Sequence, residues 1–390
     1  MDDTALKPNN TPNSMLRQSG TRIVDADGKP VTLRGVNLGG WLLWEGWIFG
    51  QPDWPIFSIS ETTLLDGLTQ LISTEDVREF RSEIYERFIT KEDIRQISLA
   101  GFNTVRVPLN HRLFTPKNEG WAKLKQLLQW CKENGIYAVI DLHAAPGGQS
   151  TCWCADPQGV EPSLPPRPGP LWSSEKYQDE TIARWQRIAE ECNGDATVAG
   201  YDLLNEPEPP SGNALVTYYE RLIHAVREVD PNHLIFLEGS DLSTDFSMFK
   251  RPPCENMVYS FHIYSWAGDK PAKLKAYQSI STEQNIPFWV GEFGEGKRSW
   301  IEEKVKYFTK QDSICGWCFW TWKKADNGMD GLVKVKIDDD WESTMSWVKN
   351  RWPPKPTAST VKSGMREFGQ NVGLENTPDK AMLKAILNLK

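Results

Sequence analysis

The chain has 390 residues, of which 39% are hydrophobic, and its formal net charge is −8. This length allows one large domain, because α/β barrels commonly run to about 250 residues or more. A negative chain without a block of Lys or Arg argues against nucleic acid or an anionic membrane surface as partner. No stretch approaches the length of a membrane-spanning apolar segment. We therefore expect a neutral partner. For the chain itself we expect a monomer.

The numbers of tryptophan and cysteine residues limit the classes of function further. The chain contains 18 Trp, and indole faces pack well on the C–H faces of sugar rings while the indole N–H reaches hydroxyls. Seven Cys imply at least one unpaired thiol within a single chain and no dense disulfide framework. Cys315 and Cys318 have the spacing of a redox or zinc site, but they continue into the apolar Phe319-Trp320 without a second pair, which favours a packed strand.

The N-terminus lacks the basic and apolar regions of a signal peptide. We expect a soluble protein, either cytoplasmic or secreted with a signal removed before this numbering begins. Residues 1–20 are polar and are expected to be poorly ordered, with one catalytic domain over residues 21–390.

Strand-like and helical patterns alternate along this domain. Eight strand-like runs are predicted at Thr32 to Asn37, Thr104 to Leu109, Tyr137 to Leu142, Val198 to Leu204, Leu234 to Glu238, Val258 to His262, Phe288 to Gly291 and Gly316 to Trp320. Helices are predicted at Lys91 to Ala100, Trp121 to Asn134, Glu175 to Cys192, Ala214 to Val229, Ala272 to Gln284 and Ile301 to Thr309. The alternation predicts a closed parallel (β/α)8 TIM barrel.

Two insertions and a terminal helix are expected to decorate the barrel. Residues 51–89 form the main insertion, predicted to be largely helical from Glu61, and residues 151–170 form a Pro-rich loop. Both follow predicted strands and should lie at the catalytic rim. Asp379 to Leu389 is predicted to be a short amphipathic helix that caps the barrel.

Polar and aromatic residues fall at the predicted strand ends, where a barrel builds its active site. They are Arg106 on strand two, His143 on strand three, Asn205 and Glu206 on strand four, His262 and Tyr264 on strand six, Glu292 on strand seven and Trp320 on strand eight. Two positioned carboxylates can cleave a glycosidic bond without a cofactor, one as acid and one as nucleophile or stabiliser. Glu206 and Glu292 are the candidates for these two roles.

The surrounding residues have supporting roles in this hypothesis. Arg106 and Tyr264 would keep Glu292 ionised, Asn205 would donate to a sugar 2-hydroxyl, and Trp320 would form the floor of the glycone subsite. For the aromatic side chains, core packing is the alternative. His143 and His262 could alternatively be metal ligands, but no third His or closely spaced carboxylate accompanies them in the sequence. The sequence predicts neither a metal nor an organic cofactor.

The set Arg106, His143, Asn205-Glu206-Pro207, His262-Ile263-Tyr264, Glu292 and Trp320 resembles family 5 glycoside hydrolases of clan A. The runs Arg34 to Trp41, Phe88 to Thr90 with Asp93-Ile94, and Asp141 to Gln149 are similar to the exo-β-1,3-glucanase branch and its bacterial relatives. The resemblance implies a retaining (β/α)8 enzyme with Glu206 as acid/base and Glu292 as nucleophile. It also implies that Glu45 binds glycone hydroxyls. Cys152-Trp153-Cys154 and the Pro-rich stretch after it depart from the glucanase pattern.

We therefore predict a retaining hydrolase of β-glucosidic bonds in β-glucans or gluco-oligosaccharides, with endo or exo action left open. A β-mannanase, a glycosylceramide-cleaving enzyme and a non-catalytic carbohydrate-binding barrel are the alternatives. At least two sugar-stacking faces are expected from five aromatic side chains near the cleft: Trp41, Trp44, Trp47, Trp153 and Trp266.

Overall fold

Eight parallel strands form the closed barrel at the centre of the structure, a computed structural model that describes residues 12, 14–52, 58–115, 120–267, 271–328, 331–374 and 377–388. In barrel order from the first strand they are β3 (Leu33–Asn37), β4 (Thr104–Asn110), β5 (Tyr137–Ala144), β6 (Val198–Asp202), β7 (Leu234–Glu238), β8 (Met257–Tyr264), β9 (Phe288–Gly294) and β10 (Ile314–Trp320). Parallel pairing of β10 with β3 closes the ring, with Gly316 opposite Leu33. The predicted TIM barrel is confirmed.

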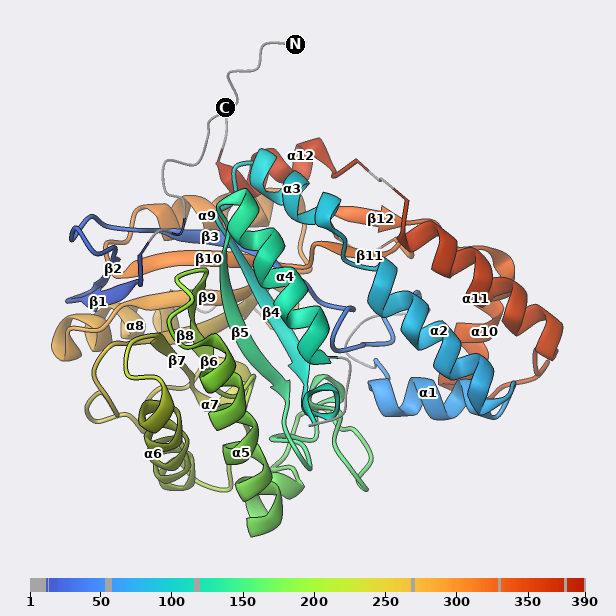
Figure 1. Ribbon diagram of the computed structural model, residues 1–390, viewed down its shortest axis with the longest axis horizontal. Helices are drawn as coiled ribbons and strands as arrows, with labels where there is room; N and C mark the ends of the chain where they lie inside the picture. The colour runs from blue at the N-terminus through green and yellow to red at the C-terminus, as the bar shows by residue number, and fades with distance from the viewer. Residues whose placement is uncertain are drawn as a thin grey trace.

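Helices follow most of these strands and surround the barrel (Figure 1). They are α3 (Lys91–Leu99), α4 (Gly120–Asn134), α5 (Glu175–Cys192), α6 (Gly212–Val229), α8 (Pro271–Gln284) and α9 (Arg298–Thr309). Their starts follow from local sequence: Thr90 and Asp93 form a reciprocal capping box at α3, and Ser174 and Ser211 cap α5 and α6. After β7 the chain makes only the short α7 (Ser240–Ser243).

A group of four helices stands to one side of the barrel (Figure 1). It comprises α1 (Glu61–Thr69), α2 (Thr74–Arg87), α10 (Asp339–Asn350) and α11 (Ala358–Val372), which pack on one another. Its core is aromatic, with the rings of Trp341 and Phe368 stacked at 5.0 Å. The helical character predicted for the insertion from Glu61 onward is therefore confirmed.

Two of the five candidate sugar-stacking side chains lie in this aromatic core rather than in a cleft. Trp41 and Trp44 are fully buried, and their indole N–H groups donate to the backbone oxygens of Tyr85 and Trp41. The loop after β3 turns both rings toward α2, so the predicted sugar-stacking faces can come only from the other three side chains.

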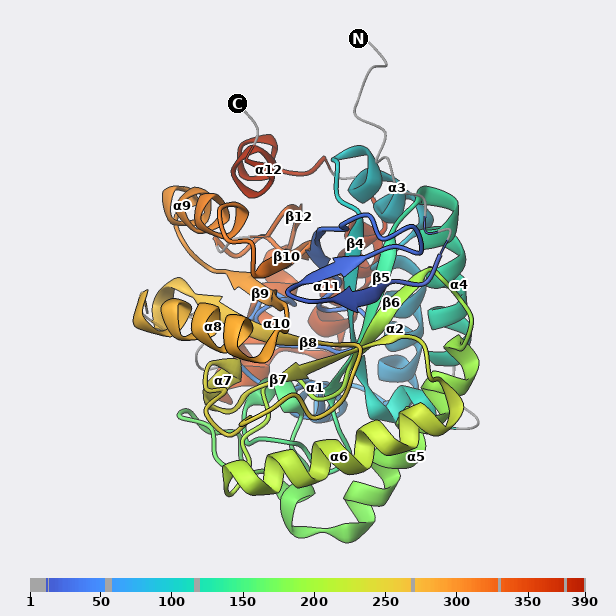
Figure 2. The same cartoon turned by 90° about the vertical axis from the view of Figure 1, so that its left-hand side faces the viewer.

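A short hairpin closes the end of the barrel where the strands begin (Figure 2). It consists of β1 (Arg17–Ser19) and β2 (Arg22–Val24), joined through Gly20 at φ 60°. Leu16 and Ile23 pack against barrel residues such as Val139 and Trp289. The hairpin was not predicted. Residues 1–20 were expected to be poorly ordered, but Arg17–Ser19 form its first strand. Residues 1–11 and 13 lie outside the described residues.

The terminal helix α12 (Lys380–Leu387) forms as predicted but does not cap the barrel. It packs along α9, and Leu387 lies next to Gly101 at the end of α3 (Figures 1 and 2). It thus stands between α9, which follows β9, and α3, which lies between β3 and β4. In a (β/α)8 barrel this is the place of the helix that follows the last strand. The β1–β2 hairpin already occupies the barrel end.

The remaining elements are short. Strands β11 (Lys323–Ala325) and β12 (Val333–Val335) pair in parallel beyond the barrel. The 3-10 turns are η2 (His111–Phe114), η3 (Trp153–Ala155), η4 (Pro170–Ser173) and η5 (Ser265–Ala267). Among the helices of the described ranges, none combines the length and apolarity needed to cross a membrane.

Candidate active site

Arg106 lies at the centre of a buried polar network inside the barrel. Its Nε donates to Asp202 Oδ2 at 2.9 Å, and its terminal nitrogens contact Asn37, Asn205, Glu238, Asp141 and Glu292 at 2.5–3.2 Å. The guanidinium is completely buried, and a buried cation is tolerated only with such compensation. One cation on β4 therefore orients side chains from β3, β5, β7 and β9, together with Asp202 in β6 and Asn205 after it.

Glu292, at the C-terminal part of β9, is held by three basic or hydroxylic groups. Arg106 donates to its Oε1 at 2.5 Å, the Tyr264 hydroxyl donates to its Oε2 at 2.5 Å, and His262 Nδ1 lies 3.5 Å from the same oxygen. Burial opposes ionisation, but His262 and Arg106, with help from Tyr264, lower the pKa of Glu292 to about 2. Glu292 is therefore an anion across the neutral range.

Glu206 follows β6 in a left-handed conformation, with φ 42°. Its backbone N–H donates to Glu238 Oε2 at 2.7 Å, and this contact fixes the turn that directs the side chain into the barrel mouth. Its Oε1 lies 2.8 Å from His262 Nδ1. Oxygen atoms of Glu206 and Glu292 lie within 4.8 Å of each other. Carboxyl groups about 5 Å apart are typical of retaining glycosidases, whereas inverting enzymes need a wider gap.

Further side chains complete the walls around this pair. The His143 ring stacks on the Trp320 indole at 5.3 Å, and His143 Nδ1 lies 2.6 Å from Asp141 Oδ2. Burial lowers the pKa of His143 well below its usual value, so a neutral imidazole faces the pocket. The strand-end residues predicted from sequence thus converge at one mouth: Arg106, His143, Asn205, Glu206, His262, Tyr264, Glu292 and Trp320.

Several members of the network were not predicted. Asn37, Asp141, Asp202 and Glu238 all contact Arg106. Gln149 Nε2 donates to the backbone oxygens of His143 and Asn205 at 2.6 and 2.7 Å. An acidic residue inside a run of apolar strand residues is the sequence signal that could have identified Asp141, Asp202 and Glu238, because such a buried carboxylate requires a partner.

The pocket above the two carboxylates is bordered by more acidic and aromatic side chains. Glu45 Oε2 accepts from the indole N–H groups of Trp47 at 3.0 Å and Trp153 at 2.9 Å. On another side, Glu295 Oε2 accepts from Trp266 at 2.7 Å. Burial raises the pKa of Glu45 and of Glu295 to about 8 in each case. Trp47, Trp153 and Trp266 therefore line the pocket, as predicted for cleft aromatics, whereas Trp41 and Trp44 do not.

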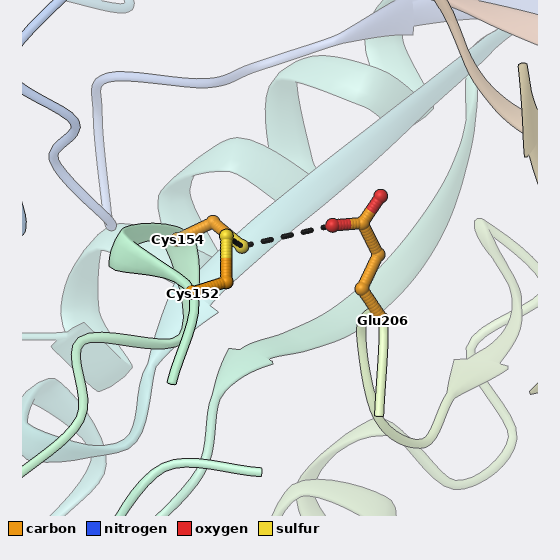
Figure 3. Close-up of side chains that lie close together, drawn as sticks. All are labelled: Cys152, Cys154 and Glu206. Atoms are coloured by element: carbon orange, nitrogen blue, oxygen red, sulfur yellow. Dashed lines mark hydrogen bonds between the residues drawn. The ribbon is translucent and has the colours of Figure 1, made fainter. Parts of the chain in front are cut away.

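Two thiols also border the pocket, on the loop that departs from the glucanase pattern. Cys152 and Cys154 flank Trp153 and are both buried and unpaired by a disulfide. Their sulfur atoms lie 2.8 Å apart, and Cys154 Sγ lies 3.7 Å from Glu206 Oε2. Figure 3 shows the Cys154 thiol directed at the Glu206 carboxylate, with the Cys152 sulfur beside the Cys154 sulfur. Cys315 and Cys318, by contrast, are buried in β10 as the packed strand that was predicted.

Glu206, His262 and Glu292 bring donor atoms within 4.8 Å of one another, a spacing that a metal ion requires. However, Glu292 already accepts from Arg106 and Tyr264, and His262 Nδ1 already contacts Glu206. A metal cation there would have to displace the Arg106 contact. The absence of a metal or organic cofactor from the reaction stays a prediction.

The sequence model for cellulases of glycosyl hydrolase family 5 matches residues 69–326, well over half of the chain. The chain belongs to glycosyl hydrolase family 5. A beta-xylosidase of Phanerodontia chrysosporium is 32% identical over 364 residues, which span 83% of this chain and 73% of that protein. A probable glucan 1,3-beta-glucosidase A of Aspergillus fumigatus is 32% identical over 246 residues, 60% of this chain and 55% of that protein.

Among solved structures, a beta-glucanase from Saccharophagus degradans superposes with a TM-score of 0.57 at 18% identity, covering 95% of this chain and 98% of that one. This likeness shows the shared fold. The family and fold predicted from sequence are thus confirmed, and the chain is a retaining O-glycosyl hydrolase of family 5. The interpretation as a non-catalytic binding barrel is not supported.

Proposed function

We propose that this chain is an exo-acting β-glycosidase that removes terminal β-linked glucosyl units from β-glucans or gluco-oligosaccharides. The observation that carries the proposal is a pocket at the barrel mouth lined by two carboxylates, Glu206 and Glu292, whose oxygen atoms lie within 4.8 Å of each other. The spacing suits double displacement, and the loops that surround the pocket suit a chain end.

The lining side chains come from nearly all of the barrel strands. Residues after β3, β5, β6, β7, β8 and β9 contribute, so loops from six of the eight strands surround the pocket, and Trp320 at the end of β10 adds to the lining. Glu45, Trp47, Leu242 and Trp266 are among the lining side chains. An endo-acting enzyme needs a groove that a polymer can cross, whereas a ring of loops admits a chain end. Exo action is therefore the better supported mode.

In the proposed mechanism, Glu292 attacks the anomeric carbon and forms a covalent glycosyl-enzyme, while Glu206 gives its proton to the departing oxygen. Glu206 then takes a proton from water, which attacks the same carbon, and the configuration is retained. Arg106 and Tyr264 keep Glu292 ionised for the first step. Asn205, held by Arg106 and next to Glu206, is the proposed donor to the sugar 2-hydroxyl.

Glu45 is the proposed ligand of glycone hydroxyls. Two indole N–H groups fix its Oε2, while its Oε1 is buried and has no hydrogen-bond partner among the described residues. A buried acceptor or acid without a partner carries a cost that a sugar hydroxyl would remove. Trp320, stacked on His143, is the proposed floor of this subsite, and Trp266 is the candidate for stacking on the next sugar.

A terminal β-xylosyl unit is the second candidate substrate. The beta-xylosidase relative matches 83% of this chain, against 60% for the glucosidase relative at the same identity. Xylose is glucose without the hydroxymethyl group at C5, so both sugars can present the same 2-, 3- and 4-hydroxyls to Glu45, Asn205 and neighbouring groups.

The deciding experiment compares kcat/KM for aryl β-glucoside and aryl β-xyloside, then sizes the products from β-1,3-, β-1,4- and β-1,6-glucans, xylan and mannan. We expect release of a monosaccharide with retained configuration, followed by NMR, and a preference for glucoside. A preference for xyloside selects the second candidate. Oligosaccharide products, mannan cleavage or hydrolysis of glycosylceramide in place of glucan would contradict the proposal.

A further inference from the structure

The Cys152–Cys154 pair stands at the pocket wall without a role in the hydrolytic mechanism. The three atoms Cys152 Sγ, Cys154 Sγ and a Glu206 carboxylate oxygen lie within 4.8 Å of one another, and all three residues are buried. In Figure 3 the two sulfurs lie side by side, and the Glu206 carboxylate lies opposite the Cys154 sulfur. Two sulfurs and one carboxylate oxygen are a donor set for a thiophilic cation, unlike the all-oxygen sets that Mg²⁺ and Ca²⁺ prefer.

We propose that Cys152, Cys154 and Glu206 form a binding site for a thiophilic divalent cation such as Zn²⁺, and that its occupation blocks hydrolysis. The three side chains supply three ligands and leave a fourth position open toward the pocket, the arrangement of an accessible zinc site.

The distances fit this cation with a small adjustment. In a tetrahedral site with Zn–S bonds of about 2.3 Å, two sulfurs lie about 3.8 Å apart and a sulfur and a carboxylate oxygen about 3.5 Å apart. The observed separation from Cys154 Sγ to Glu206 Oε2 is 3.7 Å, close to that value. The two sulfurs, at 2.8 Å, must separate by about 1 Å, which side-chain rotation can provide.

The loop that carries the thiols is fixed from several sides, so a cation would not have to order it. Trp153 between them is anchored to Glu45, and the backbone N–H groups of Ala155 and Asp156 bond back to Cys152 and Trp153. Asp156, at the end of η3, accepts from Asn110 and from the backbone of Thr62. A site built on fixed backbone binds without paying for loop ordering.

The surroundings of the thiols hold oxygen donors and no competing cation. Glu45, Glu206, Glu292 and Glu295 all line the same pocket, and no Lys or Arg stands among its lining residues in the described part of the chain. On binding, a divalent cation displaces the two thiol protons to solvent.

Inhibition is the expected consequence, and this part rests on the proposed function of Glu206 as acid/base. A carboxylate bound to a cation cannot hand a proton to the leaving group. The bound cation would also occupy the space beside the bond to be cleaved. Binding itself does not depend on that role, so the two are measured separately.

The experiment titrates the whole chain, freshly reduced, with Cd²⁺ and Zn²⁺. Binding is followed by the thiolate-to-Cd²⁺ charge-transfer absorbance and by calorimetry, and turnover is followed on an aryl glycoside. Cys152→Ser and Cys154→Ser are the test variants, each compared with its own metal-free rate. Cys254→Ser is the matched control, because Cys254 is the least buried of the seven thiols. Mg²⁺ serves as the control cation.

We expect one equivalent of Cd²⁺ to bind, a thiolate band to appear, and turnover to fall in parallel, with recovery on adding EDTA. Each test variant should bind about 100-fold more weakly or worse, since changes even outside the ligand set cost about 10- to 100-fold. Cys254→Ser should behave as the parent chain does. No binding at one equivalent, or binding unchanged in both test variants, overturns the site. If the cation binds with a thiolate band and turnover is unchanged, the site exists but the proposed role of Glu206 is wrong.

Discussion

The two ends of the barrel are built from the same eight strands but from opposite kinds of side chain. At the end where the strands begin, Leu16, Ile23 and Trp289 pack with other apolar residues under the β1–β2 hairpin. At the other end, Arg106 and its carboxylate partners form a buried network below an open pocket. Strand β5 carries both, because Tyr137 and Val139 join the apolar cluster while Asp141 and His143 face the site.

The apolar end of the barrel therefore contributes mainly to stability, and the charged end carries the catalytic groups. Apolar packing at the closed end needs only shape and volume. The charged end holds carboxylates that would be costly to bury without Arg106, and in exchange it fixes Glu292 as an anion at the pocket floor. We therefore expect substitutions at the charged end to change turnover, and substitutions at the apolar end to change the free energy of unfolding alone.

The largest effect on turnover is expected from Glu292→Ala. Without a nucleophile no glycosyl-enzyme can form, so kcat should fall by about 10⁵-fold or more for every substrate. Added azide should then occupy the vacated space and give the α-glycosyl azide, whereas Glu206→Ala should give the β-anomer on substrates with good leaving groups. Product configuration is read by NMR. The opposite anomers would mean that the two roles are exchanged.

The next effect is expected from Arg106→Gln, which removes the one cation shared by the buried carboxylates. Asp202, Glu238 and Glu292 would remain without their compensating charge, and breaking a buried pair costs about 3–5 kcal/mol. We expect that loss in the free energy of unfolding from urea titration, together with loss of turnover. Arg221→Gln, which breaks a pair with Asp179 between exposed side chains, is the control and should cost less than about 1 kcal/mol. Equal losses would contradict the central role of Arg106.

A smaller effect is expected from Tyr264→Phe, which removes the hydroxyl that donates to Glu292 Oε2. The hydrogen bond helps to hold the pKa of Glu292 near 2, so its loss should raise that pKa. Since the nucleophile must be ionised, the acid limb of kcat/KM against pH should move to higher pH. We expect kcat/KM at neutral pH to fall about 10- to 100-fold.

Tyr277→Phe is the control for this substitution, because its hydroxyl donates to the Thr244 backbone outside the pocket. It should leave the pH profile in place. In the parent chain, stabilisation from ionised Glu292 should be present above the ordinary carboxyl pKa of 4.5 and be lost as pH falls toward 2. An acid limb that stays fixed in Tyr264→Phe would show that this hydroxyl does not tune the nucleophile.

The smallest effect on turnover is expected at the other end of the barrel, from Ile23→Ala. Ile23, in strand β2 of the hairpin, is fully buried against the barrel, and truncation there should lower the free energy of unfolding by about 2–4 kcal/mol. Turnover per folded molecule should stay within about twofold of the parent value, since the cluster lies at the far end of the strands from Glu292. A marked drop in kcat would show that the two ends are coupled.

The sequence predicted what depends on period and position along the strands. All eight barrel strands were placed within two or three residues at either end, because apolar runs and helical periodicity are local signals. Glu206 and Glu292 were identified because the C-terminal ends of parallel strands meet at one mouth.

The sequence did not predict what depends on the path of a loop or on contacts distant in sequence. Trp41, Trp44 and Trp47 follow β3 within a few residues of one another, yet only Trp47 lines the pocket. The β1–β2 hairpin is too short for a periodic signal and is held by the barrel itself. The partners of Arg106 come from five strands, and no local pattern links them.

The position of α12 has a consequence for how the chain is made. The first barrel strand pairs only with the second and the last, and the gap in the ring beside it is filled by residues near Leu387. A nascent chain leaving the ribosome can form hairpins and single βα units, but it cannot close the barrel before β10 has emerged, nor cover the gap before α12 follows. Until then β3 and β10 present open edges, the condition in which chaperone binding protects a chain from aggregation.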